Sequence, residues 1–138
     1  MVRIEHVLES WKVIREDTAA AVEDFPGGEL EFRATPEMQS FGEIAAHVLQ
    51  ASDGLAGLLL SGEVDLTTPG VRQKMMPFVG FPVAPAAAPQ MAAALRSALE
   101  RRLAELAAQT PEFYAGTVTR FDGTKVTRLE MVQTLKEH

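Results

Sequence analysis

The stretch Ser40–Gln50, SFGEIAAHVLQ, fixes where one helix begins and places a histidine on it. Its first four residues match a capping box, in which a hydroxyl and a carboxylate three residues apart satisfy the first free amides of a helix. Apolar residues then recur at spacings of three and four. This spacing predicts a helix over residues 41–60, with His47 on or beside its buried face.

Three further stretches have the same helical periodicity. They predict helices over residues 4–25, 89–108 and 127–138. Pro26-Gly27-Gly28 ends the first of these helices, and Pro89 suits the first position of the third helix. Thr127-Arg128-Leu129-Glu130 is a second capping box and opens the last helix.

The connections between the predicted helices differ in length. Residues 61–88 are rich in proline and glycine and exceed the usual connection length, which indicates a crossover or a functional lid. The segment Met75–Phe81 is apolar, so we expect it to lie against the helices. Residues 112–126, with Phe121-Asp122-Gly123 as a turn, predict a loop or a short hairpin.

Four amphipathic helices with one long connection predict an all-α fold in a single domain spanning residues 1–138. The expected architecture is a four-helix bundle with an up-down-down-up course and a long crossover between helices two and three. In this arrangement helices two and three are parallel, and helix four is antiparallel to both. One contiguous core is expected, containing Trp11, Ile14, Ile44, Val48, Leu55, Leu95, Leu99, Leu103 and Val132.

Composition excludes several classes of protein. The net charge is −6, and the pair Arg101-Arg102 stands alone among acidic neighbours, so neither nucleic acid nor an anionic membrane is an expected partner. The chain contains no cysteine, which rules out disulfides, thiolate zinc sites and a cysteine nucleophile. The amino terminus has no signal-peptide pattern, so a cytoplasmic protein is expected.

The three histidines differ in their expected height in the bundle. His47 lies ~20 Å above the end where helix two finishes, and His138 climbs ~17 Å from the start of helix four at that same end. These two residues therefore fall at the same level. His6 lies only ~5 Å above that end, so a surface or capping role is expected for it.

Two imidazoles on different helices form part of a metal site, because imidazole is the commonest protein ligand for divalent transition metals. The simpler alternative is that both histidines pack or hydrogen-bond within the bundle. Glu43 and Glu137 are candidates for a third ligand. Each has a plainer explanation, Glu43 as the capping-box carboxylate and Glu137 as a surface residue of a charged tail.

The stretch Ser40–Gln50 and the ending Thr127–His138 together resemble the DinB/YfiT-like family of four-helix bundles. The resemblance implies a three-histidine site for a divalent metal ion, zinc or nickel. His47 matches the ligand on helix two, and His138 matches the first of two ligands on helix four. The second would fall four residues after His138, so a truncated fourth helix or a lost ligand is expected.

The resemblance also implies a function. It favours a metal-binding enzyme, a transferase, isomerase or hydrolase, whose small-molecule substrate or partner is a low-molecular-weight thiol activated by the metal. The alternative is a non-catalytic bundle that serves as a stress-associated binding or scaffold protein. A short fourth helix leaves apolar surface uncovered, so a homodimer is expected, with the Met75–Phe81 segment contributing to it.

Overall fold

A computed structural model of the chain describes residues 3–24, 30, 33–67, 69–80 and 87–136. The fold is mostly helical, and its main elements are α1 (Ile4–Glu23), α2 (Phe41–Leu60), α4 (Ala88–Ala107) and α6 (Arg128–Lys136). The four helices expected from the sequence are therefore present. The start of α1 and both ends of α2 coincide with the expected positions, and the other ends lie within two positions of the expected ones.

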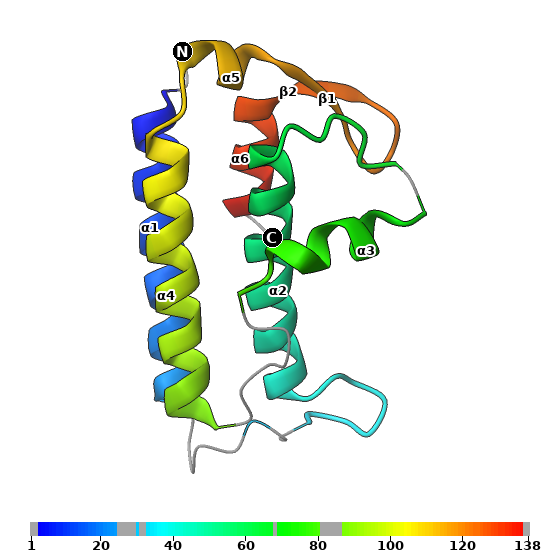
Figure 1. The fold of residues 1–138 in the computed structure, drawn as a ribbon. Coiled ribbons are helices and arrows are strands. Elements are labelled where there is room, and N and C mark those ends of the chain that lie inside the picture. The colour runs from blue at the N-terminus through cyan, green and yellow to red at the C-terminus, as the bar shows by residue number, and fades with distance from the viewer. Residues whose placement is uncertain (1–2, 25–29, 31–32, 68, 81–86, 137–138) are drawn as a thin grey trace.

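The main helices surround a common interior. α1 packs against α4 and α6, and α2 packs against the same two helices. Figure 1 shows α2 and α4 running in one direction and α1 and α6 in the other. α6 is much shorter than its neighbours, and in Figure 1 it lies beside the half of the bundle where α2 ends.

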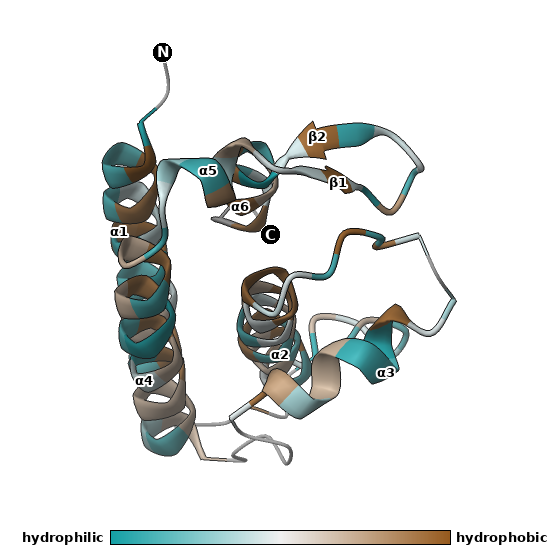
Figure 2. Cartoon of the chain, turned by 45° about the horizontal axis from the view of Figure 1, so that its top comes forward, coloured by the Kyte–Doolittle hydropathy of each residue, from teal (hydrophilic) through white to brown (hydrophobic). Residues whose placement is uncertain are grey.

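The long connection after α2 contains two short helices, α3 (Val71–Met75) and the 3-10 helix η2 (Met76–Phe78). Hydrophilic residues line the middle of α3 in Figure 2. Met75 and Phe78 pack on the core, and Val79 is buried. The expectation that this segment lies on the bundle is confirmed as far as Gly80, whereas Phe81 lies outside the described residues.

A short helix and a hairpin precede α6. Helix α5 (Pro111–Ala115) was not expected from the sequence; it begins with Pro111, and the Thr110 hydroxyl caps it by accepting a hydrogen bond from the Phe113 amide at 3.2 Å. Strands β1 (Thr117–Thr119) and β2 (Lys125–Thr127) are antiparallel. The short hairpin, one of the two alternatives for this region, is therefore confirmed. Its turn contains Gly123, whose φ of 86° suits glycine.

The two predicted capping boxes behave differently. At α6 the box is reciprocal, because the Glu130 amide donates to Thr127 Oγ1 and the Thr127 amide donates to Glu130 Oε1. At α2 only half of it forms: Ser40 Oγ accepts from the Glu43 amide at 3.1 Å, while the Glu43 carboxylate pairs with Arg33. Both hydroxyls nevertheless mark the start of a helix.

The core consists of two clusters, so the expectation of one contiguous core is wrong. The upper cluster lies beside α6 and the hairpin and includes Trp11, Leu59, Leu106 and Met131. The lower cluster lies toward the other end of α1, α2 and α4 and includes Val22, Leu49, Met91 and Leu95. Arg15 on α1 and Asp53 on α2 lie between the two clusters along their helices, and both are buried.

Five of the nine predicted core residues are buried: Trp11, Leu55, Leu95, Leu99 and Val132. Three are half-buried: Ile14, Val48 and Leu103. The prediction that Ile44 is buried is wrong, since this residue is 43% exposed. At this end of α2 the buried side chains are Ala45 and Leu49, which belong to the predicted apolar stripe, whereas Ile44 lies outside the buried face because α6 covers only the other half of the bundle.

None of the helices in the described part of the chain is both long enough and apolar enough to cross a membrane.

Candidate functional site

His47 lies on α2, but its side chain is exposed. The expectation of a buried imidazole is therefore wrong. His47, like Ile44, lies outside the buried face of α2. An exposed histidine remains able to bind a ligand that approaches from outside the core. His138, the second predicted metal ligand, lies outside the described residues.

The structure does not bring a third ligand to His47 within the described residues. Glu43 forms an exposed ion pair with Arg33. Glu137 lies outside the described residues. His6 is exposed near the start of α1, as expected for a surface histidine. Within the described ranges, no three histidine, aspartate or glutamate side chains gather closely enough to hold a metal ion.

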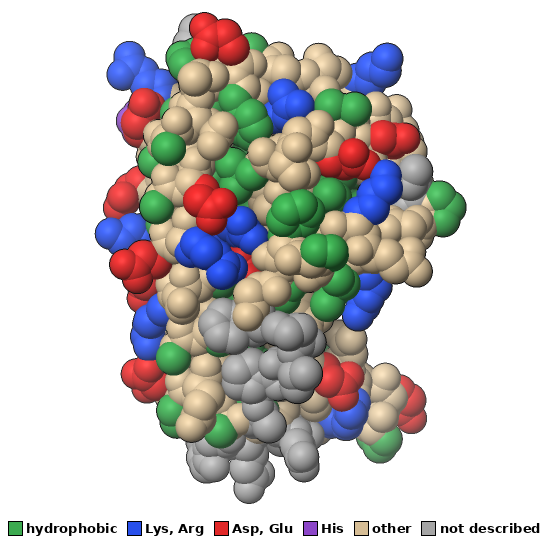
Figure 3. All heavy atoms as spheres, viewed as in Figure 1, with side chains coloured by type: hydrophobic (Ala, Val, Ile, Leu, Met, Phe, Trp, Pro, Cys, Tyr) green, Lys and Arg blue, Asp and Glu red, His purple; other side chains and the backbone are tan. Residues whose placement is uncertain are grey.

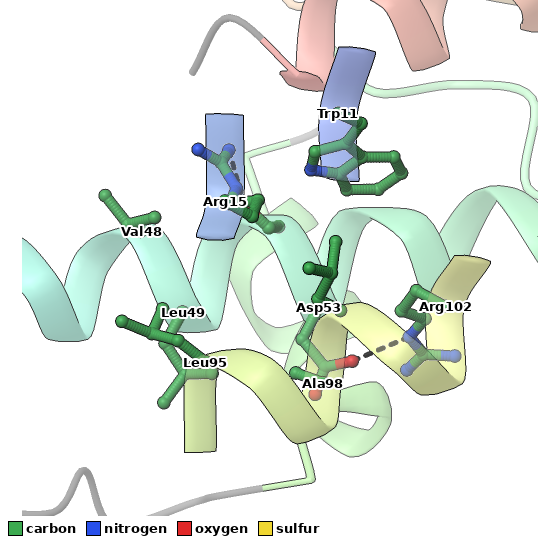
Figure 4. Close-up of a pocket in the computed structure, with 10 residues that line it drawn as sticks. Trp11, Arg15, Val48, Leu49, Asp53, Leu95, Ala98 and Arg102 are labelled. Atoms are coloured by element: carbon green, nitrogen blue, oxygen red, sulfur yellow. Dashed lines mark hydrogen bonds and ion pairs between the residues drawn. The ribbon is translucent and has the colours of Figure 1, made fainter. Parts of the chain in front are cut away.

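A small pocket lies between α1, α2 and α4, where the two core clusters meet (Figure 4). Its free volume is about 20 Å3, which is room for one water molecule. Polar and apolar side chains line it together: Trp11, Arg15, Val48, Leu49, Ser52, Asp53, Leu95, Ala98, Leu99 and Arg102. The pocket therefore brings two arginines, an aspartate, a serine and a tryptophan N–H together with apolar side chains.

On one side of the pocket, Asp53 is the centre of a buried ionic network. Its Oδ1 accepts from Arg102 Nε at 2.6 Å, and its Oδ2 accepts from the Gly80 amide at 2.7 Å. Arg101 donates to both oxygens at 2.5 Å. Charged side chains of both signs gather over α4 in Figure 3, and the half-buried Glu105 also pairs with Arg102. The charges of this network balance, with two arginines and two carboxylates.

The network joins three parts of the chain. Asp53 belongs to α2, Arg101 and Arg102 belong to α4, and Gly80 follows η2. Arg102 also donates to the carbonyl of Phe78, and Gly57 lets Phe78 approach α2 because a Cβ there would collide with that side chain. The network therefore holds the long connection against the bundle, which is a structural role.

On the other side of the pocket, Arg15 has no charged partner among the described residues. It is 5% exposed, and Nη2 donates to Ser52 Oγ at 2.9 Å and to the carbonyl of Leu135 at 3.1 Å. No described carboxylate lies within ion-pair distance of its guanidinium. Burial lowers the pKa of Arg15, which is the direction expected for a desolvated charge without compensation.

These contacts also place α1, α2 and α6 relative to one another. Arg15 reaches α2 at Ser52 and α6 at Leu135, so the last described turn of α6 lies at the level of Ser52. His47 is five residues before Ser52, ~7.5 Å along the helix axis. Leu135 is three residues before His138.

Sequence reasoning missed the polar lining of the pocket. In the sequence, Arg101 and Arg102 are only a basic pair among acidic neighbours, and neither Arg15 nor Asp53 belongs to a recognisable motif. A signal was present, since Arg15 lies one turn after Trp11 and Asp53 one turn after Leu49, both on buried faces. Charged residues at such spacing in an apolar stripe indicate a buried ionic or binding group.

The fold and the pocket define a class of protein: a helical bundle with one short helix and a polar site inside it. Residues 10–138 match the DinB superfamily, which covers nearly the whole chain, and the chain belongs to that superfamily. No curated protein matches the sequence.

Proposed function

We propose that the protein binds one divalent metal ion, zinc or nickel, through His47 and His138. The contact of Arg15 with Ser52 and Leu135 carries this proposal, because it brings α2 and the last described turn of α6 together at a point ~7.5 Å along the α2 axis from His47. His47 is exposed on α2, where an ion from solution can reach it. Membership of the DinB superfamily agrees with such a site.

His47 and His138 supply two of the protein ligands that a metal site needs. Two neutral imidazoles are suitable ligands for zinc or nickel, and the described residues offer no carboxylate that completes the site because Glu43 is paired with Arg33. Water or a substrate would fill the other positions. A metal with open positions acts as a Lewis acid and lowers the pKa of a coordinated thiol.

The proposed activity follows from this chemistry. The protein acts as a cytoplasmic metal-dependent transferase or isomerase whose partner is a low-molecular-weight thiol. The thiol sulfur serves as the nucleophile, so the absence of cysteine from the chain is no obstacle.

The experiment is a zinc and nickel titration against a competing chelator. One ion per chain is expected, and His47→Ala and His138→Ala should each weaken affinity by about tenfold or more, in line with the loss of a ligand. His6→Ala is the matched control and should leave affinity unchanged, because His6 lies near the start of α1. Chains that bind no metal, or a His47→Ala variant that binds as tightly as the parent, would contradict the site and leave the non-catalytic binding or scaffold function.

A further inference from the structure

Two buried N–H donors in the pocket have no acceptor. They are Trp11 Nε1 and Arg15 Nε, which lie one turn apart on α1. Trp11 is 1% exposed and Arg15 is 5% exposed, so bulk water does not reach either donor freely. Buried donors in folded proteins are nearly always paired, and an exception at a pocket indicates a missing partner. Both residues line the same pocket (Figure 4).

Arg15 differs from the other arginines with an unpaired Nε. Arg120 and Arg128 also have one, but both residues are only half-buried and belong to the hairpin and the start of α6. Arg15 is fully inside the bundle. Its acceptors, a serine hydroxyl and a carbonyl near the end of α6, are neutral groups, and the partial negative charge of a helix end amounts to roughly half a charge. A net positive charge therefore remains.

We propose that this pocket binds the carboxylate group of a small molecule, with Arg15 and Trp11 as the donors. A carboxylate brings one negative charge, and one of its oxygens can accept hydrogen bonds from both donors. A bound water molecule would satisfy the donors without compensating the charge. Asp53 does not serve as the anion, because Arg101, Arg102 and Gly80 occupy both of its oxygens.

The shape of the pocket restricts the ligand further. Its free volume of about 20 Å3 admits a single oxygen atom. The rest of the molecule lies toward Val48 and Ser52, which are only half-buried. The deep walls are apolar and include Leu49, Leu95 and Leu99, so they disfavour a second charge. The ligand class is thus a small monocarboxylate with an apolar body.

This inference does not depend on the proposed metal site. Carboxylate binding is measured on metal-free protein in the presence of a chelator, so failure of one proposal leaves the other intact. The chain has a single tryptophan, Trp11, and it lies in the pocket. Its fluorescence therefore reports directly on this site.

The experiment titrates metal-free protein with acetate and with acetamide at constant ionic strength. Acetamide has nearly the same shape as acetate but no charge. We expect a saturable change in tryptophan fluorescence and a rise in the melting temperature with acetate, and neither effect with acetamide. Equal responses to the two probes, or no saturable response to acetate, would overturn the proposal.

Variants locate the binding site. Arg15→Met should weaken acetate binding by at least about tenfold, because it removes a charged donor. Trp11→Phe removes the other donor and is followed by melting temperature, where the acetate-induced rise should shrink. Arg96→Met is the matched control: Arg96 is an exposed arginine on α4 paired with Glu16 and Glu23, and its loss should leave acetate affinity unchanged. An Arg15→Met variant that keeps the parent affinity would contradict the assignment.

A final variant tests whether the chain supplies its own anion. Glu137 lies outside the described residues, two positions after Leu135. Glu137→Gln should leave acetate affinity unchanged if the pocket receives an external carboxylate. Acetate binding that is at least tenfold tighter in Glu137→Gln than in the parent would mean that the chain's own carboxylate competes for Arg15, and the proposal of an external ligand would fail.

Discussion

Two buried arginines line the same pocket and differ in their surroundings. Arg102 faces the carboxylate of Asp53 at 2.6 Å, within a network whose charges balance. Arg15 faces only a hydroxyl and a carbonyl oxygen, and its Nε has no acceptor. Their exposures are nearly the same, 7% and 5%. Burial alone therefore does not distinguish the two arginines, whereas their hydrogen-bond and ion-pair partners do.

The difference separates a structural charge from one available for binding. A buried charge is stable when an opposite charge and hydrogen bonds surround it, and it is costly when they are absent. Arg102 has both an opposite charge and hydrogen bonds, and it holds the long connection against α2 and α4. Arg15 lacks the opposite charge, and it lies where the short helix α6 ends. We therefore interpret the Asp53 side of the pocket as structural and the Arg15 side as functional.

The largest expected effect is on the structural side. Asp53→Asn removes the charge that Arg102 and Arg101 share, and it should lower the free energy of unfolding by about 3–5 kcal/mol. Urea denaturation measures this value. Glu105→Gln is the control, because Glu105 also contacts Arg102 but is 41% exposed at its side chain; its loss should cost less than about 1 kcal/mol. Equal losses in the two variants would show that burial of the Asp53 carboxylate is not the decisive factor.

A smaller effect on the free energy of unfolding is expected at a third buried polar group, the Tyr114 hydroxyl, which has a hydrogen-bond partner. The Tyr114 hydroxyl donates to the carbonyl of Leu106, and burial raises the pKa of Tyr114 to about 12. Since the unfolded chain ionises at a lower pH, the contribution of Tyr114 to stability is complete below about pH 10 and is lost as the pH rises toward 12.

The loss should reach about 2–3 kcal/mol for Tyr114, following the size of its pKa shift. Urea denaturation between pH 9 and 12 should show a steeper fall for the parent protein than for Tyr114→Phe, which cannot ionise there. Parallel curves for the two proteins would contradict the shifted pKa.

The sequence predicted the helices better than the site, and particular residues explain why. Ser40 and Thr127 mark helix starts by local hydrogen bonds, which depend on residues three positions apart. Which face of α2 is buried depends on α6, which follows α2 by nearly 70 residues. The sequence therefore predicts Ile44 as buried and His47 on or beside the buried face, whereas both residues are exposed. The pocket requires Arg15, Asp53 and Arg102 to meet from three helices, and no local pattern states which of these charges pair.

The most direct measurement compares Arg15→Met with Arg102→Met by urea denaturation, in a buffer free of carboxylates. Arg102→Met leaves Asp53 short of a partner and should cost about 3 kcal/mol. Arg15→Met replaces an uncompensated charge with an apolar side chain of similar length, so its free energy of unfolding should stay within about 1 kcal/mol of the parent value or rise above it. If Arg15→Met lost as much stability as Arg102→Met, Arg15 would be a structural residue and the distinction between the two sides of the pocket would be wrong.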